Sequence, residues 1–147
     1  MKKYIMILLL FSFIMGTTNV SAQKVKEINQ VEQSIKSSGK YALLVMNPKH
    51  LKVAIMTGER FKNKSKKIDF QIVTCGEVVK EISANEELKK TVVEAVQKYG
   101  LKIVVCGLTV RQLNIDKTLL PTETPIVNNG IVYMFGLEEL GYKSISI

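Results

Sequence analysis

The chain has 147 residues, with 21 Lys and Arg against 13 Asp and Glu, a formal net charge of +8, and two cysteines. This length suffices for a single domain whose hydrophobic core needs no disulfide or metal to support it. The excess positive charge is concentrated in residues 62–67 rather than along one face, so a solvated loop explains it better than a nucleic-acid surface does. We therefore expect no nucleic-acid partner.

The first 22 residues have the layout of a secretory signal peptide. Lys2 and Lys3 precede an apolar run over residues 4–15, and Val20-Ser21-Ala22 forms a small-x-small cleavage site. The run is too short to cross a bilayer, which requires about 20 apolar residues. The sequence therefore predicts a signal peptide over residues 1–22 and an exported, periplasmic mature protein over residues 23–147 that makes no further use of the membrane.

The first half of the mature chain begins with a polar segment, residues 23–40, whose apolar side chains have loose helical spacing and predict a helical lead-in. Residues 41–46 form a continuous apolar run, which is typical of a strand buried on both faces. Asn47 and Pro48 follow it, and this pair favours the start of a helix. Residues 68–73 alternate apolar and polar side chains, which predicts an edge strand with one face in water.

In the second half, Ser83 and Glu86 have the spacing of a capping box, and Gly100 is placed to end the helix that they open. Residues 101–106 form a second continuous apolar strand, followed by a short helical turn over residues 110–113. Further elements are a short strand at 126–127, a helix from 130 to 140, and an alternating edge strand at 143–147.

Strands and helices thus alternate along the mature chain, which predicts an α/β domain with a mainly parallel sheet of five strands. With the two continuous apolar strands at the centre and the two alternating strands at the edges, the expected order is 2-1-3-4-5. Ligands in such sheets bind at the carboxyl ends of the strands where the order reverses, here between the first and third strands. Asn47 directly follows the first strand, and Cys106 ends the third.

The two cysteines, Cys75 and Cys106, each lie at the end of a strand and each precede a glycine. In the expected order their strands flank the first strand, about 9–10 Å apart, whereas a disulfide requires Cα atoms within about 7 Å. This spacing argues against a simple disulfide. Cys106 is the better candidate for a reactive thiol, because N–H groups at the start of the following helical turn lower a thiol pKa. The alternative, that Cys106 is an inert cysteine buried in the core, has equal support from the sequence.

Other chemistry has less support in the sequence. His50 is the single histidine and follows a helix-opening proline, so we expect it on the surface. A metal site would require His50, both cysteines and a carboxylate to converge without a Cys-x-x-Cys motif. We therefore expect neither a metal nor a cofactor.

Three stretches carry a family resemblance: IVTCGEVVK at residues 72–80, IVVCGLTV at 103–110, and IVNNGIVYMFGLEELGYK at 126–143. In their order and spacing they resemble the DsrE/DsrF-like family of small sulfur-handling proteins. The resemblance covers residues 41–147 and implies a three-layer α/β/α fold with an antiparallel last strand, assembled as a trimer or hexamer. It also implies that Cys106 is the cysteine that accepts sulfur as a persulfide, whereas the position of Cys75 commonly holds histidine in that family.

These observations leave three functional hypotheses. The first is an exported sulfur carrier that exchanges sulfur with donor and acceptor proteins through Cys106, with Cys75 as a second thiol. Its pocket would be formed by Gly76, Gly107 and Thr109, with Asn47 on the floor. The second is a non-catalytic oligomeric module for ligand binding or assembly. The third is a redox pair in which Cys75 and Cys106 form and break a disulfide.

Overall fold

The computed structural model describes residues 19–147; residues 1–18, which hold most of the expected signal peptide, lie outside the described residues. Helix α2 (Asn19–Gln33) begins before the expected cleavage point and continues past it. Lys36–Ile147 forms a separate compact unit, which carries the sheet. No helix of the described chain is both long enough and apolar enough to pass through a membrane.

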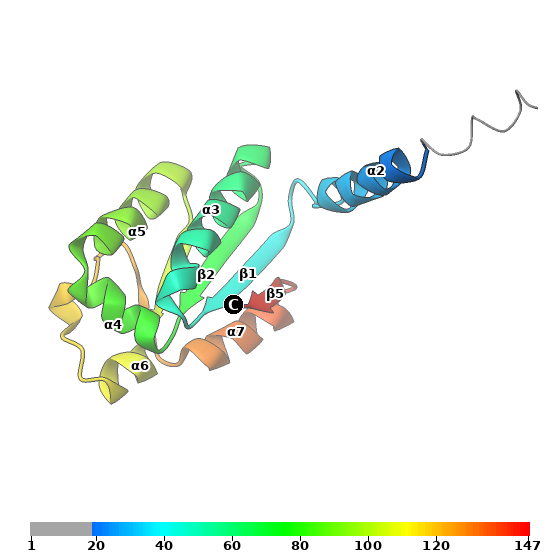
Figure 1. Ribbon diagram of the computed structural model, residues 1–147. Helices are drawn as coiled ribbons and strands as arrows, with labels where there is room; N and C mark the ends of the chain where they lie inside the picture. The colour runs from blue at the N-terminus through cyan, green and yellow to red at the C-terminus, as the bar shows by residue number, and fades with distance from the viewer. Residues whose placement is uncertain (1–18) are drawn as a thin grey trace, which may run out of the picture. The chain divides into compact units, whose positions relative to one another are not determined.

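The sheet has five strands, and every strand pairs in parallel with its neighbours. In the order β4-β3-β2-β1-β5 these are β4 (Ile126–Val127), β3 (Lys102–Cys106), β2 (Asp69–Thr74), β1 (Lys40–Val45) and β5 (Lys143–Ser146) (Figure 1). The α/β class and the edge position of β5 are confirmed. The expected order 2-1-3-4-5 is wrong, because β2 lies at the centre rather than at an edge, and the expected antiparallel last strand is parallel.

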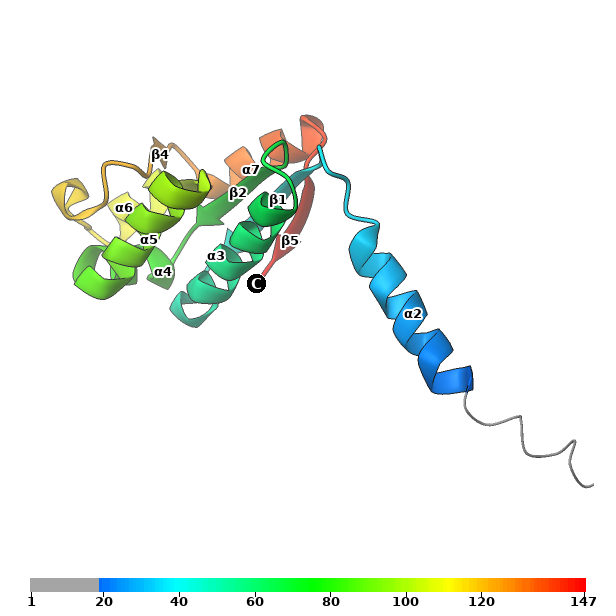
Figure 2. The ribbon, with the colours of Figure 1, turned by 90° about the horizontal axis from the view of Figure 1, so that it is seen from above.

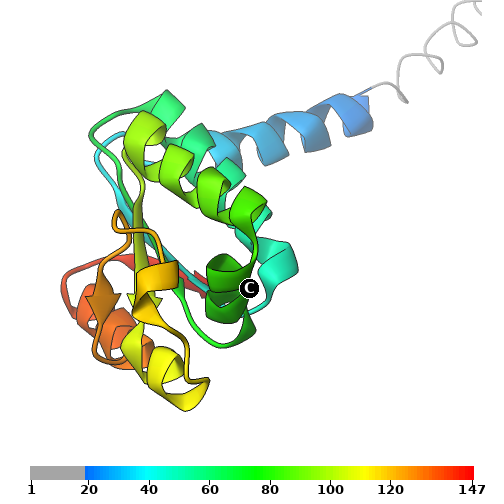
Figure 3. The ribbon, with the colours of Figure 1, turned by 90° about the vertical axis from the view of Figure 1, so that its left-hand side faces the viewer.

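The helices cover both faces of this sheet. α3 (Pro48–Lys64), α4 (Glu77–Ala84) and α5 (Glu86–Tyr99) pack together on one face, and α7 (Gly130–Glu139) covers the other (Figures 2 and 3). The short α6 (Gly107–Gln112) and a 3-10 turn η2 (Lys117–Leu119) connect β3 to β4. Since parallel crossovers are right-handed, helices that step from β1 to β3 share one face, and α7, which returns from β4 to the far edge, lies on the opposite face.

Local side-chain chemistry sets the ends of several helices. The Asn47 side chain accepts a hydrogen bond from the Lys49 N–H at 3.0 Å and caps α3, with Pro48 in the first turn as expected. Gly100 ends α5 in the left-handed region at φ 67°. The expected capping box is wrong: Ser83 lies inside α4, which continues to Ala84, and Asn85 caps α5 through the Leu88 N–H.

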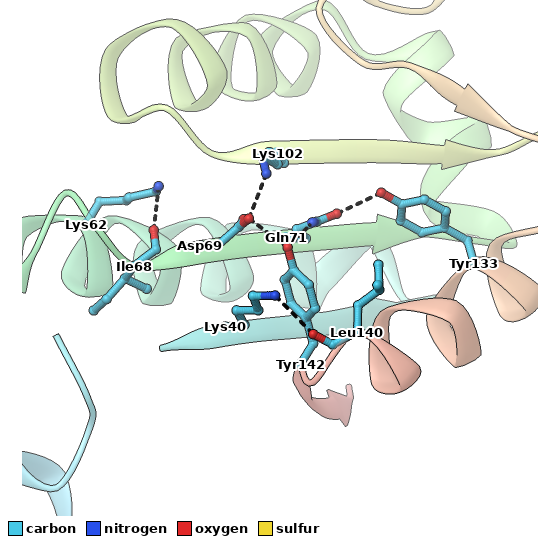
Figure 4. Close-up of polar contacts among 9 residues, drawn as sticks. All are labelled: Lys40, Lys62, Ile68, Asp69, Gln71, Lys102, Tyr133, Leu140 and Tyr142. Atoms are coloured by element: carbon cyan, nitrogen blue, oxygen red, sulfur yellow. Dashed lines mark hydrogen bonds and ion pairs between the residues drawn. The ribbon is translucent and has the colours of Figure 1, made fainter. Parts of the chain in front are cut away.

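The position of β2 is explained by a polar network beneath α7 (Figure 4). Gln71 Nε2 donates to Tyr142 Oη at 2.7 Å, and Tyr133 Oη donates to Gln71 Oε1 at 2.9 Å. Tyr142 Oη in turn donates to Asp69 Oδ2 at 2.6 Å, and Lys102 Nζ forms an ion pair with the same oxygen at 2.7 Å. The Gln71 amide and the Asp69 Oδ2, whose positions suggested a face in water, therefore have protein partners instead, whereas the Asp69 Oδ1 is buried without a hydrogen-bond partner.

This network changes the acidity of two of its members. Burial raises the pKa of Asp69, but hydrogen bonds from Lys102 and Tyr142 and the charges of Lys102 and Lys62 outweigh it, so the pKa lies below its usual value. Burial and the hydrogen bond to Asp69 raise the pKa of Tyr142 to about 12. The pair is thus held as a carboxylate and a neutral phenol that donates its proton.

Candidate functional site

The two cysteines lie side by side at the carboxyl edge of the sheet. β2 and β3 are neighbours, with Val73 opposite Val104 and Thr74 opposite Val105. Continued by one residue, this register places Cys75 opposite Cys106, on strands about 4.8 Å apart. The spacing argument against a disulfide, which assumed an intervening strand, is therefore wrong. Both residues are free thiols in the structure.

Both cysteine side chains belong to the hydrophobic cluster between the sheet and α7. Its members include Val73 and Val104 from the strands and Met134 from the helix. Cys75 is 6% exposed and Cys106 is 3% exposed, so the two thiols are almost entirely enclosed. Any chemistry at these sulfurs therefore takes place in a dry environment, where hydrogen bonds act strongly.

Gly130, the first residue of α7, lies directly against the pair. Its N–H donates a hydrogen bond to the Cys106 Sγ at 3.2 Å. A Cβ at this position would lie 2.4 Å from the Cys75 Sγ and 3.0 Å from the Cys106 Cβ, so only glycine fits. The positive end of the α7 dipole also faces this sulfur, which favours a negative charge on it.

Thr109 also acts on the Cys106 sulfur. The Thr109 Oγ1 accepts a hydrogen bond from the Gly76 N–H at 3.0 Å, which leaves its own proton to be donated elsewhere. Both the N–H and the O–H of Thr109 act on the Cys106 sulfur. Gly76, at φ 68°, adopts the left-handed backbone region that favours glycine.

The pKa values of the two thiols are shifted in opposite directions. Burial raises the pKa of Cys75 to about 12, and the neighbouring Cys106 adds to this effect. Burial also raises the pKa of Cys106, but the Gly130 N–H, the two Thr109 groups and the Cys75 S–H together outweigh it, so its pKa lies below the ordinary value. The arrangement favours ionisation of Cys106 before Cys75, and the Cys75 S–H donates a hydrogen bond to the Cys106 sulfur.

The remaining expected pocket residues divide into two groups. Gly107 lies beside the cysteines because it follows Cys106 directly in the chain, and it packs against β4, where a Cβ would lie 2.6 Å from the Val127 carbonyl oxygen. Asn47 lies away from the cysteines, because β2 separates its strand from that of Cys106 and its side chain caps α3.

Arg111 is exposed and donates to the Asn128 Oδ1 at 3.2 Å, two residues before Gly130.

His50 is exposed in the first turn of α3, on the face of the sheet away from the cysteines. Within residues 19–147, no three histidine, cysteine or carboxylate side chains gather closely enough to hold a metal ion.

The sequence reasoning missed Gly130 as a site residue. The available signal was its position: Asn129 caps α7 through the Ile131 N–H at 2.9 Å, so the glycine occupies the first helical residue. Glycine has no conformational advantage there, since its φ is not positive. A glycine without a backbone reason indicates a close approach by a neighbouring group.

No protein-family model matches the chain, and no curated protein matches it. Two solved structures share its fold. The first is a protein of unknown function, MTH1491, from Methanobacterium thermoautotrophicum, with a TM-score of 0.66 and 14% identity, covering 74% of this chain and 99% of that one. The second is a conserved protein of unknown function, BT1422, from Bacteroides thetaiotaomicron, with a TM-score of 0.63 and 17% identity, covering 78% and 99%. At these identities the likeness establishes the α/β fold alone.

Proposed function

We propose that this domain is a sulfur carrier that holds sulfur as a persulfide on Cys106. The observation that carries the proposal is the convergence of donors on one sulfur: the Gly130 N–H at 3.2 Å, the N–H and O–H of Thr109, and the S–H of Cys75. A thiolate is the nucleophile in sulfur transfer, and donors of this kind lower the pKa of a buried cysteine and so favour its thiolate. The resemblance of residues 41–147 to the DsrE/DsrF-like family points to the same residue.

The transfer step conserves atoms and charge. The Cys106 thiolate attacks the outer sulfur of a donor persulfide, R–S–SH, the donor S–S bond breaks, and the thiolate R–S⁻ leaves. The product is Cys106–S–SH, and the reverse reaction with an acceptor thiolate unloads it. No external oxidant or reductant is needed, because the sulfane sulfur only changes its partner.

Access to the site depends on the segment that leads into α7. Cys106 is 3% exposed and the Gly130 N–H contacts its sulfur, so a donor reaches the sulfur only after the residues around it move. Two hydrogen bonds from Arg111 to Asn128, at 3.2 and 3.4 Å, hold this segment at the surface.

As the sequence and the resemblance imply, the proposed carrier is exported and forms a homo-oligomer.

A second function, a redox pair, is favoured by one observation. The register places Cys75 directly opposite Cys106, which is a spacing that permits a disulfide. In that case an oxidant removes two electrons and two protons from the thiols. The loaded persulfide and the disulfide differ in composition, so mass distinguishes the two functions.

The experiment compares the intact mass of the protein before and after exposure to a low-molecular-weight persulfide such as glutathione persulfide. The variants are Cys75→Ser and Cys106→Ser. A gain of one sulfur that persists in Cys75→Ser and is lost in Cys106→Ser supports the carrier. Loss of two hydrogens without added sulfur favours the redox pair, and no change in mass would leave only a binding or assembly module.

A further inference from the structure

The Cys75 sulfur lies next to the sulfur that carries the persulfide in the proposed function. Thr74 pairs with Val105 in the parallel register of β2 and β3, so the next residues along the two strands, Cys75 and Cys106, lie opposite each other. Both side chains belong to the hydrophobic cluster on the α7 face of the sheet. The Cys75 S–H donates a hydrogen bond to the Cys106 sulfur. A second thiol is therefore in contact with the atom to which the transferred sulfur would be attached.

The spacing of the pair permits a bond between the two sulfurs. Neighbouring strands lie about 4.8 Å apart, which is within the range of about 4.4–6.8 Å between the Cα atoms of a disulfide. Gly130 touches both side chains, since a Cβ on it would lie 2.4 Å from the Cys75 Sγ and 3.0 Å from the Cys106 Cβ. Glycine at this position therefore leaves the contact between the two cysteines undisturbed.

The enclosure of the site favours a reaction between these two residues over a reaction with an outside thiol. Cys75 is 6% exposed and Cys106 is 3% exposed. An acceptor from solution reaches the site only after the surrounding residues move, whereas Cys75 is in contact with Cys106 in the closed structure. Two groups held in contact react as in a unimolecular step, with an effective concentration far above that of a dissolved thiol. A persulfide on Cys106 therefore has Cys75 as its nearest reaction partner.

From this geometry we infer a further activity: Cys75 discharges the persulfide on Cys106 and releases the outer sulfur as sulfide. The inference rests on the proposed function, because it starts from the loaded Cys106. Its products are hydrogen sulfide and a disulfide between the two cysteines. Neither the carrier nor the redox pair yields both products, because a carrier passes its sulfur to another thiol and a redox pair needs an external oxidant.

The discharge step balances without a further reactant. The Cys75 sulfur attacks the inner sulfur of Cys106–S–SH, the bond between the inner and outer sulfurs breaks, and the outer sulfur leaves with the electron pair of that bond. The proton of the Cys75 thiol goes to the departing sulfur, which thus leaves as hydrogen sulfide. This group leaves more readily than a cysteine thiolate, because hydrogen sulfide is the stronger acid. A dithiol reductant from solution then reduces the disulfide and restores both thiols.

The low acidity of Cys75 gives the loaded state a lifetime. Burial raises the pKa of this thiol to about 12, so only a small fraction of it is ionised near neutral pH. Because the thiolate is the attacking species in such exchanges, discharge is slower than loading through the more acidic Cys106. Transfer to an acceptor and release as sulfide therefore compete for the same bound sulfur.

The test loads the full-chain protein with glutathione persulfide in the absence of oxygen, removes the donor by rapid desalting, and follows intact mass and free sulfide with time. The central variant is Cys75→Ser, with Cys75→Ala in its place if the serine variant does not fold. The matched control is Val104→Ala, which truncates another buried member of the same cluster and keeps both thiols. Circular dichroism checks the fold of each variant, and a wild-type sample without donor checks that the thiols stay reduced.

We expect the wild type and Val104→Ala to lose the added sulfur as sulfide and to end two hydrogens lighter than the unloaded protein. Cys75→Ser should keep the added sulfur at least about tenfold longer, since its discharge depends on outside thiols. The final wild-type mass equals that of an oxidised redox pair, and the persulfide trapped in Cys75→Ser distinguishes the two.

Three results would overturn the inference and leave the carrier intact: a wild type that keeps its added sulfur as long as Cys75→Ser does, a Cys75→Ser that releases sulfide as fast as the wild type, or a folded Val104→Ala that holds the sulfur as long as Cys75→Ser. A whole glutathione bound to Cys75→Ser would also overturn it, because the sulfide would then come directly from the donor. A Cys75→Ser that takes up no sulfur at all would refute the proposed function itself, and the inference with it.

Discussion

Replacement of Gly130 by alanine tests how tightly α7 is fitted to the cysteine pair. The added methyl group would lie 2.4 Å from the Cys75 Sγ and 3.0 Å from the Cys106 Cβ, and also 3.3 Å from a Val73 methyl group. Since nonbonded carbon atoms prefer about 3.5–4.0 Å, the first contact is more than 1 Å too short. Overpacking of this kind costs about 1–3 kcal/mol, and we expect Gly130→Ala to lower the free energy of unfolding by that amount.

Urea unfolding followed by circular dichroism measures this loss, and a double-mutant cycle identifies its origin. Cys75→Ala removes the sulfur that makes the shortest contact. In that background Gly130→Ala should cost far less, because the remaining contacts are longer and the φ of Gly130 suits alanine. Alanine is also the better helix former, which reduces the cost further.

The same variant should raise the pKa of Cys106, because the N–H of residue 130 must move away from the sulfur to make room for the methyl group. Two results would refute the reasoning. One is a Gly130→Ala protein as stable as the wild type. The other is an equal loss of stability with and without the Cys75 sulfur, which would place the strain elsewhere.

Three further variants test other parts of the account. Tyr142→Phe leaves the buried Gln71 Nε2 without its partner, so urea unfolding should show a loss of about 1–3 kcal/mol; a loss below about 0.5 kcal/mol would contradict the network. Asp69 has a lowered pKa, so its carboxylate stabilises the fold above its unfolded value near 3.8, and this stability disappears as the pH falls through the lowered value. Asp69→Asn should therefore lose stability less steeply below that pH than the wild type, and equal slopes would argue against the shift. Asn47→Ala should cost about 1 kcal/mol through its lost helix cap and leave the pKa of Cys106 unchanged; a shifted pKa would place Asn47 in the site after all.

The class of the fold could be predicted from the sequence because alternating strand and helix patterns are local. The order of the strands could not, because it depended on where Asp69 and Gln71 find hydrogen-bond partners. Their alternation with apolar residues resembles a strand with one face in water. The partners are Tyr133 and Tyr142, more than sixty residues away in the chain, and no local pattern indicates such a contact.

The candidate site was predicted only in part, because some of its contacts are local in the chain and others are distant. Cys106, Gly107 and Thr109 are neighbours in the chain, so the start of a helix after the strand could be anticipated. The contact of Cys106 with Cys75 depended on the order of the strands, and its contact with Gly130 on the position of a distant helix end. Asn47 was placed near the site by the wrong order and in the structure caps a helix.

The central claim is that the fold lowers the pKa of Cys106 and raises that of the neighbouring Cys75, so that Cys106 ionises first. The most direct test is a pH titration of the protein with carbon-13 in its cysteine Cβ atoms, followed by NMR, with Cys75→Ser and Cys106→Ser for assignment. This measurement reads the charge of each sulfur without requiring access to it. The account predicts that Cys106 titrates below the ordinary thiol value of 9.0 and that Cys75 stays protonated until about pH 12. A Cys106 pKa at or above the ordinary value, or a Cys75 that ionises first, would contradict it.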